Sequence, residues 1–593
     1  MINQTRTLLV VALLVVAYLL WQQWQHDYPS TPPPPPAAAA VSSASSGAPA
    51  VAGSAAVPEV PASTAGVPAA PVATAATAAT SGGVATSHVP QTAGSASATP
   101  ARDLVTVSND VLRLTIDPRG GTIVAADLLV YPQEVKSGSP PVRLLDGASA
   151  RYYVAQNGLV GAEGSAAPSH LAEFTPTATH YSLGAGQKQV VVTLDWRDPA
   201  SGIDVVKRYT LTRGSYVVDL TQQVDNHGGK TWQGNAYEQL DRIEPPPPPK
   251  HLLEFYNPDS LSFTGAAWYS PDSKFNKLKF EDFETEPLHE AVTGGWIAMS
   301  QRFFLSAWIP PVKQAERFSS VEIPPSTPEG KARYLIRSMG PTLSIAPGAS
   351  ATSRAQLYIG PKLQNELGDI APGLNLTVDY GMFTVIAAPM FKLLSFLHTL
   401  VGTWALAIIV LVLIIQAATY KLTEAQYKAG ARMRKLQPRL KALKERFGDD
   451  KQKYQQAMME LYKKEKINPM AGCLPALITM PIFFALYYVL IFSVELRHAT
   501  FLWIPDLSAA DPYFILPILY ALTMLGTSFL TPQQGMDPTQ AKIMKVMPVL
   551  FSVLFFFFPA GLTLYYVVRG ICMVSQQWYV TRKIDRAESR ARA

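Results

Sequence analysis

The sequence predicts a multi-domain membrane protein, with an α-helical transmembrane core of five spans plus an N-terminal anchor helix and a large periplasmic all-β sandwich domain. Three observations predict this fold class: apolar stretches of membrane-spanning length, strand-like alternation between the first two stretches, and a change of charge along the chain. The apolar stretches are Leu8 to Trp24, Val401 to Tyr420, Met470 to Val494, Tyr513 to Leu530, Met544 to Phe558 and Ala560 to Tyr579.

The first apolar stretch, within residues 1–28, has two interpretations. A basic start at Arg6 followed by an apolar core also fits a cleavable signal peptide. No small-x-small cleavage site directly follows the core, and Trp21 and Trp24 suit a membrane interface. We therefore expect an uncleaved transmembrane anchor. Residues 29–100 are mostly Pro, Ala, Ser, Thr and Val, and we expect them to form a disordered linker.

The distribution of charge predicts the topology. Residues 27–379 carry 25 Lys and Arg against 32 Asp and Glu, whereas residues 380–593 carry 24 against 12. The connection 421–468 has 14 basic and 6 acidic residues, and the tail 581–593 has 5 and 2. Basic loops remain in the cytoplasm. We therefore expect a multi-pass protein of the bacterial cell inner membrane, with both termini in the cytoplasm and the large domain in the periplasm.

Residues 101–375 are predicted to form the β-sandwich. Both cysteines fall in candidate spans, so this domain must rely on its own apolar core. It has no catalytic constellation and no metal-ligand spacing, and we expect no cofactor, no metal and no DNA binding. A carbohydrate groove lined by tryptophans is an alternative use of this domain. Strands are indicated at Val111 to Asp117, Thr122 to Leu129, Gln189 to Trp196, Val205 to Thr212 and Tyr216 to Val224.

Residues 376–400 are predicted to form an amphipathic helix on the outer membrane interface. Lys392, Ser395, His398 and Thr399 fall along one side at helical spacing, and the rest of the circumference is mostly apolar. The alternative is that this helix only extends the second span.

The connection 421–468 is predicted to form a cytoplasmic hairpin of two antiparallel helices. Thr423 and Gln426 fit a capping box, Pro438 should bend the first helix, Gly448 should end it, and Asp449 or Asp450 should cap the second. The basic charge suits attraction to anionic lipid, or docking of a nascent chain, a ribosome or a targeting receptor. The seam residues are Met433, Leu436, Leu440, Leu443 and Phe447, then Tyr454, Met458 and Leu461. The docking candidates are Arg432, Arg434, Lys435, Arg439, Lys441 and Lys444.

Several short motifs follow one another in the last third of the chain. They are Gly448-Asp449-Asp450-Lys451-Gln452-Lys453, Lys466-Ile467-Asn468-Pro469, Gly472-Cys473-Leu474-Pro475, Met480-Pro481-Ile482-Phe483, Ser493-Val494-Glu495-Leu496-Arg497, Asp511-Pro512-Tyr513 and Phe558-Pro559-Ala560-Gly561-Leu562. Together they resemble the core of the YidC membrane protein insertases of the Gram-negative type. The resemblance implies a core at 401–580, with a hydrophilic groove open to the cytoplasm and lipid, that inserts nascent inner-membrane proteins and helps them fold. It also implies work alone or with the Sec translocon, and no enzyme activity.

The candidate groove residues depart from the family at two positions. The family usually has an arginine in the second span where this chain has Gln416, and commonly a serine where this chain has Arg569. At ~1.5 Å per residue, Arg569 lies roughly 15 Å from either end of its span, where a charge needs a wet cavity or a polar partner. We expect that the groove charge has moved to Arg569; snorkelling to the headgroups is the alternative. Thr479, Tyr565 and Tyr566 are further groove candidates, or helix-packing contacts.

Two other functions compete with this interpretation. A transporter or channel that couples to ions uses acids or histidines inside the membrane, and the five core spans contain neither. An enzyme or carbohydrate module on a membrane anchor would leave the basic hairpin and the ordered core motifs without a role.

Overall fold

The structure is a computed structural model of the 593-residue chain. The predicted anchor, 1–28, and the predicted linker, 29–100, lie outside the residues that it describes. The described residues are 103–162, 165–246, 262–325, 327, 330–447, 450–465, 474–530, 547, 550 and 552–592.

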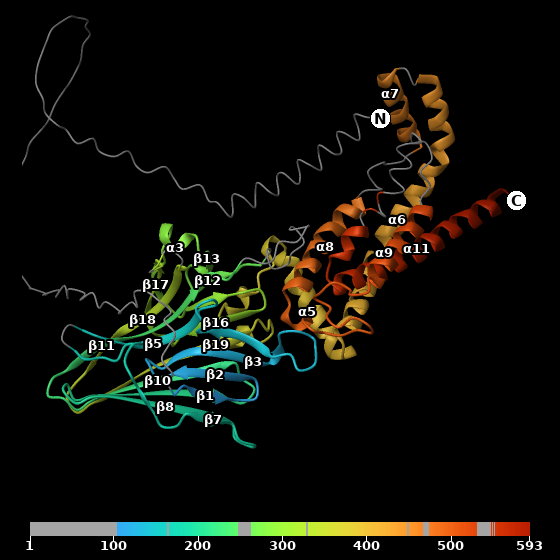
Figure 1. Cartoon of the computed structure of the whole chain (residues 1–593). Helices are drawn as coiled ribbons and strands as arrows, with labels where there is room; N and C mark the ends of the chain where they lie inside the picture. The colour runs from blue at the N-terminus through green and yellow to red at the C-terminus, as the bar shows by residue number, and fades with distance from the viewer. Residues whose placement is uncertain are drawn as a thin grey trace, which may run out of the picture. The chain divides into compact units, whose positions relative to one another are not determined.

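Within the described residues, strands from Val105 to Pro361 form two sheets of a sandwich, one with ten strands and one with nine (Figure 1). The larger sheet runs in the order β14 (His289–Thr293), β17 (Ala315–Ile323), β18 (Arg333–Ile345), β11 (Trp232–Ile243), β5 (Tyr153–Gly161), β4 (Pro141–Asp146), β3 (Thr122–Pro132), β2 (Leu112–Asp117), β1 (Val105–Ser108) and β7 (His180–Ser182). The smaller sheet runs in the order β13 (Lys274–Leu278), β12 (Gly265–Ser270), β15 (Trp296–Ser300), β16 (Phe304–Ile309), β19 (Ser350–Pro361), β10 (Val217–Asn226), β9 (Ile203–Thr212), β8 (Gln189–Asp198) and β6 (Thr175–Pro176).

The five strands predicted from alternation are confirmed as β2, β3, β8, β9 and β10, with ends that differ by three residues at most. The reason is visible in β9 and β10, where every second side chain is buried. Period-two burial is what one face of a sheet against a core imposes. The prediction of a β-sandwich in this region is therefore confirmed.

Polar side chains cross the interior of the sandwich and bond to the opposite sheet. The Tyr209 hydroxyl of β9 donates to the carbonyl of Gly121 at 2.6 Å. Nζ of Lys207, also on β9, donates to the carbonyls of Gly120 at 2.7 Å and Asn157 at 3.1 Å. Burial lowers the pKa of Lys207 to about 7. These hydrogen bonds join the two sheets. They also compensate the desolvation cost of burying the Tyr209 and Lys207 donors.

The remaining described elements are helical. They are α3 (Asp282–Thr285), α4 (Leu367–Ile370), η2 (Leu374–Thr377), η3 (Gly381–Phe383), α5 (Thr384–Val401), α6 (Trp404–Phe447), α7 (Lys451–Lys464), α8 (Leu474–Phe492), η5 (Val494–Leu496), α9 (Ile515–Leu530), η6 (Val553–Phe556) and α11 (Ala560–Arg592).

Helices α5 and α6 are separate, so α5 does not extend the second span. Gly402 ends α5 in the left-handed region at φ 75°, and its N–H donates to the carbonyl of His398 at 2.8 Å. Only glycine adopts this conformation without a steric penalty. The His398 ring then stacks on Trp404, the first residue of α6, with ring centroids 4.0 Å apart.

The capping box predicted at Thr423 and Gln426 is wrong. Helix α6 runs without a break from Trp404 to Phe447, and Thr423 lies in its middle. The Thr423 hydroxyl donates to the carbonyl of Thr419 at 3.1 Å, one turn back. A threonine whose hydroxyl bonds within its own helix does not have to begin a new one. The second span and the first hairpin helix are consequently one continuous element.

The two helices of the predicted hairpin, the cap of the second helix and the described part of the seam are confirmed. Asp450 caps α7, since its side chain accepts from the backbone N–H of Lys453 at 3.1 Å. Pro438 lies inside α6. Gly448 and Asp449 lie outside the described residues. The seam buries Leu436, Leu440, Tyr454 and Met458, with Leu443, Phe447, Leu461 and Tyr462 packed against them.

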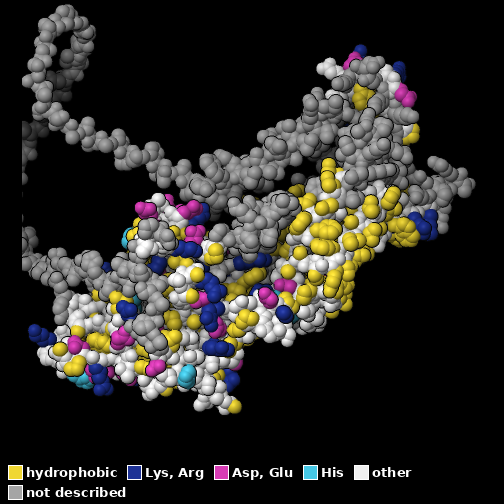
Figure 2. Space-filling model, in the orientation of Figure 1, with side chains coloured by type: hydrophobic (Ala, Val, Ile, Leu, Met, Phe, Trp, Pro, Cys, Tyr) yellow, Lys and Arg dark blue, Asp and Glu magenta, His cyan; other side chains and the backbone are white. Residues whose placement is uncertain are grey.

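The described helices carry a strongly apolar surface. Gly381–Val401 and Trp404–Lys428 are long and apolar enough to cross a membrane, while Met480–Phe492 and Ile515–Leu530 are apolar but shorter. Figure 2 shows hydrophobic side chains gathered over the helical part, in contrast to the mixed surface over the strands. The predicted span Met544 to Phe558 lies largely outside the described residues.

Polar contacts join the end of the β region to the connection that follows α8. Gln364 donates its backbone N–H to Oε1 of Glu495 at 3.2 Å and its Nε2 to Oγ of Ser493 at 3.1 Å. Arg302 donates to the carbonyl of Ile491, in the last turn of α8, at 3.0 Å. The sandwich and the helical core are thus bonded at named atoms.

Candidate substrate site in the helical core

Helices α6 and α11 run parallel, and two contacts fix their register (Figure 1). A Cβ placed on Gly561 would lie 3.5 Å from Cδ1 of Ile408. Further along, Oγ1 of Thr423 and Oε1 of Gln576 are 3.1 Å apart and hydrogen-bonded. The two residues of each pair are separated by the same 153 positions in the sequence. A constant separation is what two parallel helices in fixed register require.

Gln416 and Arg569 share this separation, so they lie at the same level of the two helices. Each stands seven residues before a partner of the Thr423–Gln576 bond, which is two turns or about 10 Å along the axis. Seven residues return to nearly the same helical face, so both positions are directed toward the helix interface. Nε2 of Gln416 is buried and lacks a hydrogen-bond partner among the described residues.

Arg569 is surrounded by tyrosines from three helices. Its guanidinium carbon lies 5.9 Å from the ring centroid of Tyr566, which stands one turn earlier in α11. The Tyr566 ring is in turn 5.1 Å from that of Tyr565 and 5.6 Å from that of Tyr520 in α9. The Tyr427 hydroxyl of α6 donates to the carbonyl of Met573, one turn after Arg569. No ion pair joins Arg569 to an acid in the part of the chain that the structure describes. Arg569 is therefore an arginine in a tyrosine-rich region of the core, without an acidic partner among the described residues.

The Tyr566 ring lies where several elements meet. Its centroid is 5.4 Å from that of Phe483 in α8, 5.6 Å from Tyr520 in α9 and 5.0 Å from Phe555 in η6. Tyr565 packs edge-on against it at 5.1 Å and is 2% exposed. These aromatic contacts hold the first turns of α11 rigidly and so position Arg569 one turn beyond.

Helix α9 approaches α11 very closely beside Arg569. A Cβ on Gly570 would lie 2.3 Å from Oγ1 of Thr523. No real side chain fits such a separation, so glycine is required here for the two helices to pack. The close approach brings the Tyr520 turn of α9 next to the Arg569 turn of α11.

The structure describes the side chains of four of the five predicted groove residues. Arg569 lies level with Gln416 of α6, and Tyr565 and Tyr566 stand one turn before Arg569 in α11, with Tyr566 turned toward α8 and α9. The side chain of Thr479 lies outside the described residues.

Of the predicted docking residues, Arg439 has a described side chain, and it pairs with Glu465 at 2.5 Å across the hairpin. Glu465 therefore partly neutralises the charge of Arg439 within the hairpin. The side chains of Arg432, Arg434, Lys435, Lys441 and Lys444 are not among those described.

Sequence reasoning missed three polar residues that complete the site. Tyr427 donates to the carbonyl of Met573 at 3.4 Å, Gln576 donates to the carbonyl of Tyr420 at 3.2 Å, and Tyr520 lies beside Tyr566. Tyr427 could have been predicted if α6 had been recognised as one helix through Thr423. In a continuous helix, Tyr427 falls on the same face as Gln416, three turns later.

Comparison with known proteins identifies the family. Residues 104–393 match the family described as the YidC periplasmic domain, and residues 396–588 match the 60Kd inner membrane protein family. The membrane protein insertase YidC of Pseudomonas fluorescens is 40% identical over 596 residues, covering 99% of both chains. That of Azotobacter vinelandii is 41% identical over 589 residues, covering 98% of this chain and 99% of its own.

The chain belongs to the YidC family. In YidC terms, the two sheets are the periplasmic domain and the helical region is the inner-membrane part. A solved structure of an active YidC insertase covers 81% of this chain and 93% of its own, at 18% identity and a TM-score of 0.36. A galactose mutarotase related enzyme from Lactobacillus acidophilus covers 43% of this chain and 97% of its own, at 9% identity and a TM-score of 0.28. At these TM-scores, neither structure adds to the family assignment.

Proposed function

We propose that this YidC-family chain is a membrane protein insertase that inserts nascent inner-membrane proteins and helps them fold. Relatives that match it over nearly their whole length bear that name. The observation that carries the residue-level proposal is the position of Arg569 opposite Gln416, at one level of two parallel helices. The proposal requires no chemical catalysis.

The hydrophilic groove lies, in this proposal, between the facing sides of α6 and α11. A charge inside a membrane span costs on the order of 2.5 to 3.5 kcal/mol unless it meets water or a polar partner. Tyrosines of α6, α9 and α11 lie in the same part of the core as Arg569. These groups support a wet site, where Arg569 attracts the acidic residues of a substrate's hydrophilic tail. The tail then has less hydrocarbon left to cross.

The apolar segment of the substrate leaves into lipid along the outside of the helices. Helix α9 exposes Ile518, Leu522 and Phe529, the last with 81% of its surface accessible. Sliding against such a face and then entering lipid buries the segment's apolar surface, at about 25 cal/mol per Å². This gain drives insertion, so the proposal needs no cofactor and no nucleotide.

The finer topology is also part of the proposal. Five core spans comprise α6, α8, α9, the segment Met544 to Phe558, and α11, with the anchor in 1–28 as a sixth. Both termini lie in the cytoplasm. Helix α5 lies on the outer membrane interface, where its exposed Val385, Phe396 and Leu400 meet lipid.

The partners follow from the charge of the cytoplasmic side. The hairpin at 421–468 has 14 basic and 6 acidic residues. Such a field attracts rRNA, acidic protein surfaces and anionic lipids. We therefore include a ribosome and a targeting receptor among the partners, with the Sec translocon as a partner in insertion.

The decisive experiment is site-specific photocrosslinking from position 569. A photoreactive residue at 569 is presented to a stalled nascent chain with a single span and an acidic tail, and insertion is assayed in parallel in Arg569→Ala. We expect crosslinks to the tail and a loss of insertion. Absence of crosslinks together with normal insertion would reject Arg569 as a groove residue, while insertion by the wild-type chain alone tests the family-level activity.

A further inference from the structure

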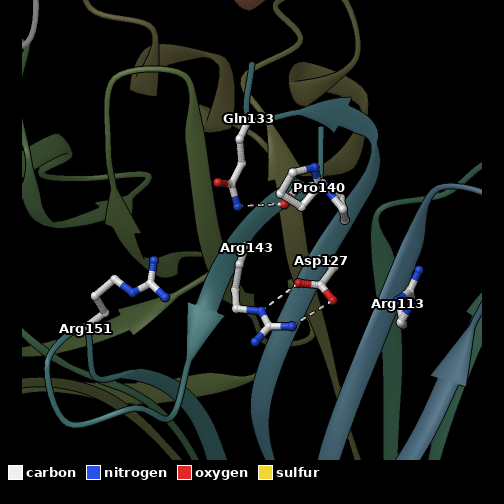
Figure 3. Close-up of a pocket in the computed structure, with 7 residues that line it drawn as sticks. Arg113, Asp127, Gln133, Pro140, Arg143 and Arg151 are labelled. Carbon is white, nitrogen blue, oxygen red and sulfur yellow. Dashed lines mark hydrogen bonds and ion pairs between the residues drawn. The ribbon is translucent and has the colours of Figure 1, made fainter. Parts of the chain in front are cut away.

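The outer face of the larger sheet contains a hollow of about 320 Å³ lined by arginines (Figure 3). We call it the Arg113 hollow. Figure 3 shows the Arg143–Asp127 pair in its middle, with Arg113 on one side and Arg151 on the other. Its lining residues are Arg113, Asp127, Gln133, Pro140, Pro141, Arg143 and Arg151.

Strand register places two guanidinium groups on either side of one carboxylate. Arg113 of β2 stands opposite Asp127 of β3, which stands opposite Arg143 of β4. Arg143 donates to both carboxylate oxygens of Asp127, from Nε to Oδ1 at 2.8 Å and from Nη2 to Oδ2 at 3.2 Å. Asp127 is therefore already neutralised by one arginine, and the charge of Arg113 is left over.

The left-over charge is accessible. Arg113 is exposed, and its side chain has no hydrogen bond or ion pair within the residues that the structure describes. Arg151, on the other side of the hollow, pairs with Asp146 at 3.1 Å and remains 68% exposed. The three arginines of the lining stand against two aspartates, Asp127 in the lining and Asp146 beside it, which leaves one net positive charge for an anion with several acceptor oxygens.

The position of the hollow indicates where the anion comes from. Gln133, which lines it, accepts a hydrogen bond from Nη2 of Arg497 at 3.1 Å through its backbone carbonyl. Arg497 belongs to the connection 493–514 between the apolar helices α8 and α9. In the proposed topology, Arg497 stands five residues after the end of α8, and the end of a membrane-spanning helix lies at the level of the lipid headgroups. The β3–β4 hairpin must reach the same level.

The same hairpin presents apolar side chains to its surroundings. Val130 is 57% exposed and Val135 is 42% exposed. Exposed valines beside arginines are the combination that a bilayer surface accommodates, with the apolar groups toward the acyl boundary and the cations at the phosphates. This pattern favours a lipid headgroup over an anion from free solution.

We propose that the Arg113 hollow binds the phosphate of an anionic phospholipid in the outer leaflet of the inner membrane. Arg113 supplies the uncompensated charge, and Arg143 and Arg151 supply further N–H groups. Binding would hold the β3–β4 hairpin on the bilayer and so fix the periplasmic domain above the helical core.

Native mass spectrometry of the full chain tests the proposal. The chain in detergent is mixed with equal amounts of phosphatidylglycerol and phosphatidylcholine, and the lipid retained by each variant is measured. We expect preferential retention of phosphatidylglycerol, about tenfold weaker in Arg113→Gln, because one charge-assisted contact is lost. Arg354→Gln is the matched control, since Arg354 is an exposed arginine on β19 of the other sheet; its retention should equal that of the wild type.

Two further readouts, lipid crosslinking and binding of inorganic phosphate, make the result decisive. A photoactivatable phosphatidylglycerol should crosslink to peptides within 130–141 in the wild type and not in Arg113→Gln. Equal retention by wild type and Arg113→Gln overturns the proposal. Binding of inorganic phosphate that depends on Arg113, without retention of phosphatidylglycerol, also overturns it and leaves a site for free anions. Arg151→Gln replaces Arg113→Gln if the latter unfolds at a lower temperature than the wild type.

Discussion

Gln416 of α6 and Arg569 of α11 lie at the same level of two parallel helices, two turns before the Thr423–Gln576 hydrogen bond. A side chain at either position therefore reaches the same depth of the helical core. An arginine at either position would therefore place its charge at the same depth. Substitutions at 416 and 569 can test whether this charge is needed for insertion.

We predict that Arg569→Ala lowers insertion of a substrate with an acidic tail, and that adding Gln416→Arg restores it. Loss of a charge-assisted contact of roughly 1.5 to 3 kcal/mol corresponds to about a tenfold or larger decrease in rate. Insertion into reconstituted vesicles gives the rate, and a substrate with a neutral tail serves as the control. Full activity of Arg569→Ala with the acidic tail would show that Arg569 has no role in the groove.

The close contact of α9 with α11 gives a second prediction, on stability. A Cβ on Gly570 would lie 2.3 Å from Oγ1 of Thr523, so Gly570→Ala should destabilise the helical core by about 1 to 3 kcal/mol through overpacking. Thr523→Ala should rescue part of this loss. Thermal unfolding in detergent measures the effect.

Gly526→Ala is the matched control for this prediction. A Cβ on Gly526 would meet methyl groups of Val574 at 3.4 and 3.7 Å, which is ordinary van der Waals contact. We expect a change of less than about 1 kcal/mol there. Equal unfolding temperatures for the two alanine variants would contradict the close packing of α9 on α11.

The fold of the periplasmic domain could be predicted because its signal is local. A strand such as β9, with alternate residues buried, carries its own period-two pattern in ten consecutive residues. The strand order could not be predicted, since β11 pairs with β5 and β18, which lie far away in the sequence. Non-local pairing leaves no trace in a local pattern.

The candidate site divides in the same way. Arg569 was recognisable because a charge inside an apolar span is rare and costly. Its tyrosine neighbours from α6 and α9 were not, because they depend on how three helices are packed. The capping box at Thr423 was misleading, since the hydroxyl that could begin a helix instead bonds one turn back within it.

The hairpin of α6 and α7 gives a third prediction. Leu436 is 4% exposed in the seam between α6 and α7, so Leu436→Ala should destabilise the docking of α7 by about 2 to 5 kcal/mol. Hydrogen exchange in 451–464 should accelerate in this variant. Arg439→Gln is the control, because an exposed ion pair such as Arg439–Glu465 contributes at most about 1 kcal/mol. Faster exchange in Arg439→Gln than in Leu436→Ala would show that the ion pair, and not the apolar seam, holds α7 on α6.

The joint between the β region and the connection after α8 should depend on pH. Burial raises the pKa of Glu495 to about 7, with one carboxylate oxygen bonded to Gln364 and the other without a partner among the described residues. The folded state therefore holds a proton that the unfolded chain, with an ordinary glutamate pKa near 4.5, releases more easily. The stability that this proton contributes is complete below about pH 4.5 and is lost as the pH rises through about 7.

We therefore predict that the wild type loses on the order of 3 kcal/mol of unfolding free energy through Glu495 as the pH rises from about 4.5 to 8. Glu495→Gln should not show this loss. Thermal unfolding of both proteins across this range isolates the effect, because the buried Lys207 and Asp241 titrate in both and cancel in the difference. The two unfolding curves should coincide at the acidic end, and the variant should be the more stable protein at pH 8. A difference that stays constant with pH, or that grows toward acid, would mean that Glu495 keeps an ordinary pKa and that the joint is not proton-linked.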